Sequence, residues 1–218
     1  MGEFFRVLTD NWELYSRAFT MTIRLFRVSA VGGLILGAVL GAMRVSPVPA
    51  LRAFGTFYVN TVRNTPLTLV FAFLVFAVPK LGVNFDYETG AYIALIVYTA
   101  AFVCEVVRSG INTVAAGQSE AARALGMTFD QVLGSVVLPQ ASRAMIPPLM
   151  SVMIAMFKNT TIAAGFSVLE AGAIPAYMAE RGEPQFAVLL WITIGFLILI
   201  LPLVFLQRHL ERRWAVAR

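Results

Sequence analysis

The chain has 218 residues, of which 59% are hydrophobic and only 13% are charged, and its mean hydropathy is +0.78. A soluble domain carries about a quarter charged residues, so this composition excludes an ordinary water-soluble protein. Charges are nearly absent from five stretches, each long enough to cross a bilayer, since about 20 apolar residues suffice for a spanning helix. The five predicted spans lie near residues 20–43, 54–79, 88–109, 141–165 and 185–207.

The first eighteen residues predict a helix that lies on the membrane surface. Apolar side chains recur there at intervals of three and four, as they do in interfacial amphipathic helices. These side chains are Phe4, Phe5, Leu8, Trp12, Tyr15 and Phe19. The alternative is that residues 1–18 extend the first span. A signal peptide is not expected, because the segment lacks a basic-then-apolar order and a small-residue cleavage site.

Lys and Arg predict the orientation, because the cytoplasmic loops of membrane proteins carry an excess of these residues. With the N-terminus outside, the outer hairpins hold only Lys80 and Arg181, together with five carboxylates. Four arginines near the N-terminus oppose this orientation, and three carboxylates offset them in part. We therefore expect the N-terminus outside and the C-terminus, with a basic tail over 208–218, in the cytoplasm. The high pI then reflects topology rather than binding to nucleic acid.

A polar segment over 116–138 separates the third and fourth predicted spans and would face the cytoplasm. Its first part is rich in strong helix formers, and Gly126 follows where a helix ends in a left-handed residue. Thr128 and Gln131 have the spacing of a capping box, so a second short helix should begin there. Two short helices joined by a glycine hinge form a compact knob. From these residues alone, an ordinary helical loop remains the alternative.

This segment resembles the cytoplasmic signature of bacterial ABC importer permeases. That signature is EAA, three residues, Gly, nine residues, an aliphatic residue, one residue and Leu-Pro. The matching positions are Glu120, Ala121, Ala122, Gly126, Val136, Leu138 and Pro139, with Val136 where Ile is usual. The resemblance implies that this coupling segment, with Glu120 and Arg123 at its rim, docks into a groove of a separate ATPase subunit.

Other stretches resemble the polar amino-acid subfamily of these permeases, and most of all its glutamate-type members. The resemblance covers roughly residues 15–208. The matching stretches are VRNTPLTLVF (62–71), FVCEVVRSGI (102–111), LPQASRAMIPPL (138–149) and KNTTIA (158–163). This chain departs from the pattern where Asn64 and Ser109 replace glycines and where the usual Asn after the Pro-Pro-Leu is shifted or absent.

The resemblance implies an all-α integral membrane protein of the type I ABC importer fold, a single transmembrane domain over 1–218 in the bacterial plasma membrane. It also implies partners: a pair of P-loop ATPase subunits that bind ATP and Mg, a second identical or homologous permease, and an extracytoplasmic amino-acid-binding protein. The chain has no phosphate loop of its own, because neither lysine follows a glycine. We expect neither catalysis nor a cofactor or metal in this chain.

Ionisable groups inside the predicted spans are costly and therefore need a structural or functional reason. Glu105 and Arg108 are three residues apart and share a helix face, which favours an ion pair, with an inner gate as the alternative. Arg63, Asn64 and Thr65 precede a proline in the second span. They are candidates for substrate contact, for a gate, or for hydrogen bonds to freed carbonyl groups.

A polar block interrupts the fourth span about ten residues after Pro147 and Pro148. Its members are Lys158, Asn159, Thr160 and Thr161. The two prolines remove helix hydrogen bonds, which favours irregular backbone lining a cavity. We expect the polar block to face the translocation path, while a pairing of Lys158 with a carboxylate of a second permease is the alternative. An excess of cations within the spans favours an acidic amino acid as substrate.

Two other classes of protein, an intramembrane enzyme and a stand-alone carrier, fit these residues less well than a transport subunit. An intramembrane enzyme needs a nucleophile with a base, or clustered metal ligands, and the one histidine, His209, lies in the tail. A stand-alone secondary carrier usually has more spans and an internal repeat, and no convincing repeat is present. We therefore predict a permease subunit that imports a polar amino acid by alternating access, with a stand-alone carrier as the alternative.

Overall fold

The computed structural model describes residues 2–214, apart from the side chains of Glu3 and Trp214, and every regular element in this range is helical. The α-helices are α1 (Gly2–Thr9), α2 (Trp12–Val45), α3 (Pro49–Arg63), α4 (Leu67–Ala72), α5 (Tyr87–Asn112), α6 (Ala116–Ala124), α7 (Phe129–Val132), α8 (Leu138–Asn159), α9 (Ile174–Glu180) and α10 (Gln185–Trp214). Two π-helical turns are η1 (Phe73–Ala77) and η3 (Leu133–Val137), and three 3₁₀ turns are η2 (Val78–Leu81), η4 (Thr160–Phe166) and η5 (Ala171–Ala173).

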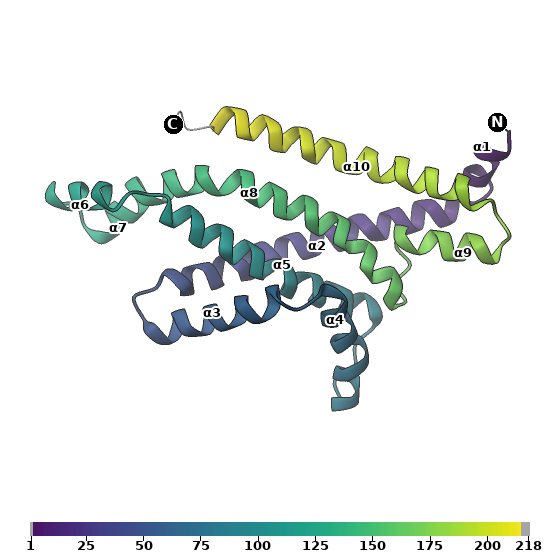
Figure 1. The fold of residues 1–218 in the computed structure, drawn as a ribbon, viewed down its shortest axis with the longest axis horizontal. Coiled ribbons are helices and arrows are strands. Elements are labelled where there is room, and N and C mark those ends of the chain that lie inside the picture. Colours follow the sequence, from purple (N-terminus) through teal and green to yellow (C-terminus); the bar gives the residue numbers. More distant parts are fainter. Residues whose placement is uncertain (1, 215–218) are drawn as a thin grey trace.

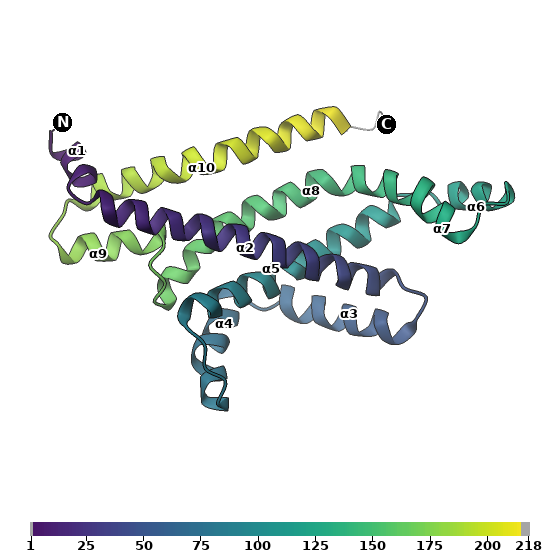
Figure 2. The ribbon, with the colours of Figure 1, turned by 180° about the vertical axis from the view of Figure 1, so that it is seen from behind.

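The long helices lie roughly along one axis, and the two ends of this axis carry different features (Figure 1). The coupling segment, with α6 and α7, projects at one end, whereas α1, α9 and the described N-terminus lie at the other (Figure 2). Four helices are long and apolar enough to cross a membrane: α2, α5, α8 with its flanking turns, and α10. A fifth span is possible if α3 and the helix from Leu67 to Leu81 are counted together.

The second predicted span, near residues 54–79, is bent at the proline that interrupts it. Its two halves meet at 102°, and the break lies between Arg63 and Leu67. Pro66 has no backbone N–H and disfavours helical backbone in the residue before it, so the helix ends there. Asn64 caps the end of α3, and Pro66 stands at the start of α4. As a result, α4 points away from the bundle (Figure 1).

The helix predicted over 1–18 is divided into two, because α1 ends at Thr9 and α2 begins at Trp12. The amide of the Asn11 side chain donates to the Val7 carbonyl oxygen at 3.1 Å. Short polar side chains that bond to nearby backbone compete with helix hydrogen bonds, which accounts for the break. Residues from Trp12 onward thus extend the first span, as the alternative interpretation supposed, while α1 is a separate short helix.

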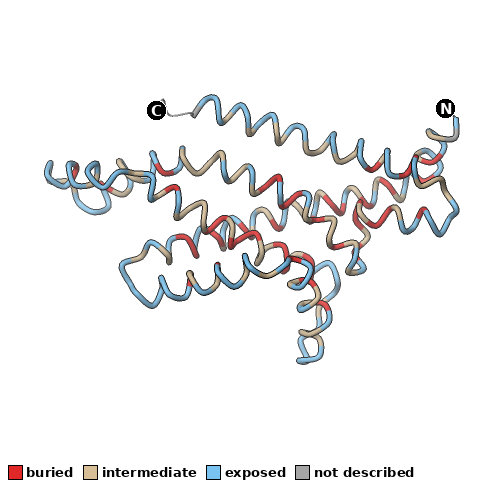
Figure 3. Tube along the Cα trace, in the orientation of Figure 1, coloured by how far each residue is buried: buried red, intermediate tan, exposed pale blue. Residues whose placement is uncertain are grey.

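Helix α2 packs against α5 through glycines, and the two helices run parallel. A Cβ atom at Gly37 would lie 2.5 Å from the Val103 Cβ, and one at Gly41 would lie 2.7 Å from a Val107 methyl. The absence of side chains on these glycines lets the backbones approach closely, as in membrane helix pairs with small residues at the contact. This pair forms the centre of the molecule, where buried residues concentrate (Figure 3).

Helix α8 continues as an α-helix through Pro147 and Pro148, which corrects the prediction of irregular backbone at these residues. The irregular backbone occurs instead at η4, which begins at Thr160. At its other end α8 is continuous with the coupling segment, because a π-helical turn over Leu133–Val137 leads directly into it. Pro139 lacks a backbone N–H, and the wider π-helical turn before it carries the chain into α8 without a break.

Candidate functional site

The coupling segment forms a projecting knob with the two predicted local features. Gly126 has φ of +83°, in the left-handed region, and ends the turn after α6. The backbone N–H of Gln131 donates to the Thr128 hydroxyl oxygen, and the backbone N–H of Thr128 donates to the Gln131 side-chain oxygen. This reciprocal capping box starts α7. These contacts fix the angle between two helices that are each too short to be stable alone.

Large apolar side chains stand exposed on this knob. Leu125 is 85% exposed and Phe129 is 65% exposed, while Ala122 is buried against the knob itself. Glu120, Ala121, Arg123, Leu138 and Pro139 are also exposed. An exposed apolar tip with charges beside it is typical of a surface that another protein covers. The structure thus brings the predicted coupling residues together at one end of the molecule.

Glu105 lies at the centre of an arginine cluster, which consists of Arg44, Arg63, Glu105 and Arg108. Its carboxylate accepts from Arg44 at 2.5 Å and from Arg108 at 3.0 Å, and it lies 3.3 Å from Arg63. The predicted Glu105–Arg108 contact is therefore present. Arg44 was not predicted as a partner because it is 61 residues from Glu105 in sequence, and only the packing of α2 on α5 brings them together.

The arginine cluster leaves a formal excess of two positive charges near the end of the molecule that carries the knob. An open hollow of about 670 Å³ lies beside it, lined in part by Arg44, Arg52, Asn60 and Arg108. The guanidinium groups of Arg44, Arg52 and Arg108 all line this hollow and attract anions. The hollow is therefore suited to negatively charged groups.

Arg63 connects this cluster to a second cavity. Its guanidinium lies 5.3 Å from the centre of the Phe102 ring, a cation–π contact. Asn64 and Thr65, which were predicted beside it, bond back to the carbonyl groups of Asn60 and Thr61 at 2.7 and 2.8 Å. These two side chains therefore provide hydrogen bonds to carbonyl groups at the end of α3. Of the three predicted residues, only Arg63 joins the arginine cluster.

The second cavity lies between α5 and α8 and has a volume of about 350 Å³. Polar side chains reach it from both helices and alternate with apolar ones. The lining residues are Tyr98, Thr99, Phe102, Ser151, Val152, Ala155, Met156 and Asn159. A mostly apolar cavity with a few convergent polar groups is the usual form of a small-molecule site.

The polar block is split between this cavity and the turn that follows α8. Asn159 lines the cavity, whereas Lys158 is exposed and has no ion pair among the residues described. Thr160 is fully buried, and its hydroxyl donates to the Phe157 carbonyl oxygen at 2.7 Å. Thr161 likewise donates to the Lys158 carbonyl oxygen at 2.8 Å. The two threonines therefore shape the end of α8.

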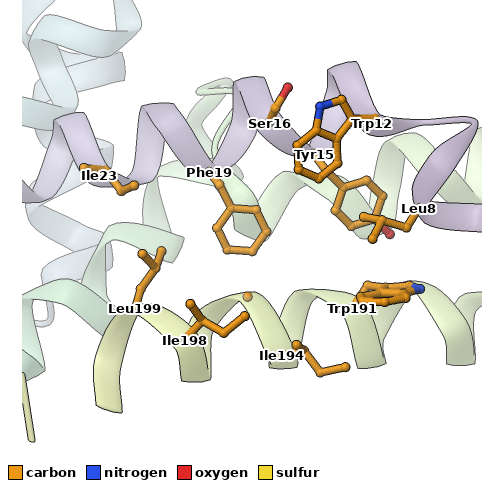
Figure 4. Close-up of a pocket in the computed structure, with 11 residues that line it drawn as sticks. Leu8, Trp12, Tyr15, Ser16, Phe19, Ile23, Trp191, Ile194, Ile198 and Leu199 are labelled. Carbon is orange, nitrogen blue, oxygen red and sulfur yellow. The ribbon is translucent and has the colours of Figure 1, made fainter. Parts of the chain in front are cut away.

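A third cavity, of about 280 Å³, lies between α2 and α10 near the described N-terminus. Figure 4 shows that aromatic and aliphatic side chains, including Phe19 and Ile198, face it from the two helices. Its lining is mostly apolar, and the hydroxyls of Tyr15 and Ser16 are the polar groups of its non-tryptophan side chains. A zwitterionic amino acid would lose most of its hydration there for few hydrogen bonds in return, so this cavity suits an apolar group better than a polar substrate.

The knob, the arginine cluster and the cavity between α5 and α8 occur in a chain whose sequence matches a known family. The model of that family, "Binding-protein-dependent transport system inner membrane component", matches residues 33–216. The chain belongs to this family. It is therefore a multi-pass permease of the plasma membrane, and ATPase and binding-protein partners belong to the transport systems of such components.

Curated relatives of this permease align with it over nearly its whole length. The glutamate transport system permease protein GluC of Corynebacterium efficiens is 45% identical, and the alignment covers 92% of this chain and 94% of the relative. The probable glutamine ABC transporter permease protein GlnM of Bacillus subtilis is 32% identical, with 95% and 96% covered. The glutamate/aspartate import permease protein GltK of Escherichia coli is 30% identical, with 89% and 91% covered.

Solved structures of similar fold are also ABC transporters. The permease superimposes on a chain of a crystal structure of an amino acid ABC transporter with histidines, with a TM-score of 0.88 and 25% identity. That alignment covers 94% of this chain and 96% of the other. A chain of the MetNI methionine ABC transporter in an inward-facing conformation gives a TM-score of 0.76 at 20% identity, which supports the fold alone. The predicted type I importer fold is confirmed.

Proposed function

We propose that this permease imports a polar amino acid, with an acidic one such as glutamate preferred, by alternating access driven by separate ATPase subunits. It works as half of a permease pair, identical or heterologous, and receives substrate from an extracytoplasmic binding protein. ATP and Mg bind to the partner ATPases and not to this chain. The observation that carries the proposal is the preformed knob, which presents an exposed apolar tip at one end of the spans.

The knob transmits force because it is continuous with a spanning helix. The π-helical turn over Leu133–Val137 joins α7 to α8 without a loop, so movement of the knob moves α8. The cavity between α5 and α8 changes shape when α8 moves. Closure of two ATPases on two knobs would thereby open and close the path. This is alternating access with the motor on separate chains.

The preference for an acidic substrate follows from charge. The arginine cluster adjoins the cavity through Phe102, which lines the cavity and lies under the Arg63 guanidinium. Its excess of two positive charges favours a substrate with a second carboxylate. The names of two relatives, the glutamate permease GluC and the glutamate/aspartate permease GltK, support the same class.

In the proposed orientation, the knob lies in the cytoplasm and the N-terminus lies outside. The knob and the described N-terminus lie at opposite ends of the molecule (Figure 1). Arg44, Arg52, Arg108 and Arg123 gather toward the end that carries the knob, in agreement with the excess of cations on the cytoplasmic side. The last turn of α10 carries Arg212 and Arg213.

Purification of the tagged permease from its native membrane in mild detergent tests the assembly. We expect a P-loop ATPase to copurify, and mass spectrometry would show one or two kinds of permease. Leu125→Ser should lower ATPase recovery, because it removes the most exposed apolar side chain of the knob. Leu81→Ser is the matched control, since Leu81 is 76% exposed and lies outside the knob. A stable complex without ATPase would favour a stand-alone carrier.

Uptake measured with the purified complex in liposomes tests the substrate. Glutamate and aspartate should compete for uptake more strongly than glutamine or arginine, provided that the cognate binding protein is present. A complex that imports arginine faster than glutamate would overturn the acidic preference while leaving the import mechanism standing.

A further inference from the structure

Glu170 is a fully buried carboxyl group in the connection between α8 and α9. One carboxyl oxygen, Oε1, accepts from the Gly172 amide at 2.7 Å and so caps the short turn η5. The other, Oε2, lies 3.0 Å from the Thr22 hydroxyl of α2, which is also fully buried. Glu170 and Thr22 are 148 residues apart, so this contact joins distant parts of the chain.

The same two residues form a closed set of hydrogen bonds, here named the Glu170 clasp: Thr22, Glu170, Ala171 and Gly172. The Thr22 hydroxyl oxygen accepts from the Ala171 amide at 2.9 Å, in addition to its contact with Glu170. The neighbouring buried side chains of Ala18 and Ile174 are apolar. A buried polar group is tolerated when its hydrogen bonds are made, and here each carboxyl oxygen has a partner.

The hydrogen-bond geometry accommodates both the charged and the neutral carboxyl group. The Thr22 hydroxyl donates to Oε2, and the Ala18 carbonyl oxygen, 3.2 Å from the same hydroxyl, is a second acceptor. When the carboxyl group is neutral, the Thr22 hydroxyl can donate to Ala18 and accept the carboxyl proton from Oε2. Oε1 remains an acceptor for Gly172. Desolvation by burial raises the pKa of Glu170 to about 7, against lowering by hydrogen bonds from Thr22 and Gly172. No charged side chain among the described residues contributes to this shift.

The clasp is in direct contact with the polar block after α8. A Cβ atom at Gly172 would lie 3.1 Å from both the Cβ and the carbonyl oxygen of Thr161, and 2.5 Å from Glu170 Oε1. Gly172 is therefore held between the carboxyl group and Thr161, and a larger side chain would push the two apart. Because Asn159 lines the cavity two residues earlier, a displaced clasp displaces the cavity wall.

We propose that Glu170 is a positioning residue for transport, which with Thr22 holds the turn after α8 against α2 and thereby fixes Thr161 and Asn159 at the cavity. The inference rests on the proposed function, since it assigns a task to residues of the same path. Glu170 contacts the backbone and Thr22 rather than the cavity. It therefore affects the cavity only through the polar block, whose Thr161 lies against Gly172. The connection between α8 and α9 thus moves with α2 during the cycle.

Thr22→Val in the assembled complex tests the clasp, and Thr193→Val is its matched control. Both hydroxyls donate to the carbonyl group four residues earlier in a spanning helix, but only Thr22 also bonds a second element. In liposomes, Thr22→Val should lower uptake per ATP hydrolysed about three- to tenfold, the size expected from one lost buried hydrogen bond. Its basal ATP hydrolysis should match that of Thr193→Val.

Glu170→Gln keeps a donor for Thr22 and an acceptor for Gly172, so it should restore uptake that Glu170→Ala loses. Hydrogen exchange of residues 158–173 provides a readout independent of transport, and it should rise in Thr22→Val but not in Thr193→Val. Equal uptake per ATP and equal exchange in both threonine variants would overturn the inference. If exchange rises in Thr22→Val but not in Thr193→Val, while the wild-type complex shows no ATP-driven uptake, the proposed function is refuted and the clasp stands.

Discussion

Replacing Gly126 with valine tests whether the left-handed hinge of the knob is needed for docking of the ATPase. Gly126 has φ of +83°, and a Cβ atom there would meet nothing within 4 Å. The cost of the substitution is therefore conformational and not a clash with neighbours. Left-handed backbone costs an L-residue about 1–2 kcal/mol. In the proposed complex the ATPase docks on the folded hinge, so we expect its affinity for the permease to fall by about 5- to 30-fold.

The measurement is the dissociation constant of the purified ATPase for permease held in nanodiscs. Gly134→Val is the matched control: Gly134 also has open space around it and lies in the same segment, but its φ is not positive. Gly126→Asn should be milder than Gly126→Val, since Asn tolerates the left-handed region. If Gly126→Val binds the ATPase as tightly as the Gly134 variant, the hinge conformation has no part in docking.

Two further predictions concern the spans and the clasp. Arg44→Met should lower the unfolding temperature of the complex more than Arg108→Met, because the Arg44 side chain is only 10% exposed, against 39% for Arg108; equal shifts in a thermal-unfolding assay would contradict this. Protection of residues 168–173 from hydrogen exchange, corrected for intrinsic rates, should be higher at about pH 5 than at about pH 8. The pKa of Glu170 is raised from 4.5 in the unfolded chain to about 7 in the fold, so the stability contributed by the neutral carboxyl group is full below pH 4.5 and is lost as the pH rises through 7. A Glu170→Gln variant should lose this pH dependence.

The sequence predicts the spans and the knob well because both depend on local signals. Apolar runs of span length identify α2, α5, α8 and α10, and their hydropathy is independent of tertiary contacts. The capping box at Thr128 and the left-handed Gly126 likewise depend on residues within four positions of each other. The geometry of such a motif is determined by neighbouring residues in the sequence, so the motif can be recognised before the fold is known.

The pairing of charges could not be predicted, since it depends on which helix faces pack together. The sequence indicates Glu105–Arg108 because i and i+3 share a face on any helix. Arg44 and Arg63 join the same carboxylate only because α2 and α3 both lie against α5. Glu170 is one of the five carboxylates of the predicted outer hairpins, and nothing in its local sequence indicates that Thr22 lies beside it.

The prolines show why a local rule can predict the wrong position. Pro66 breaks its helix, whereas Pro147 and Pro148 lie within α8. The difference lies in what surrounds them: Asn64 and Thr65 cap the carbonyl groups before Pro66 with their own side chains, which lets the chain turn. Past Pro147 and Pro148, α8 continues as a helix that packs against α5. A continuous α8 can carry movement of the knob toward the cavity, as the proposed coupling mechanism requires.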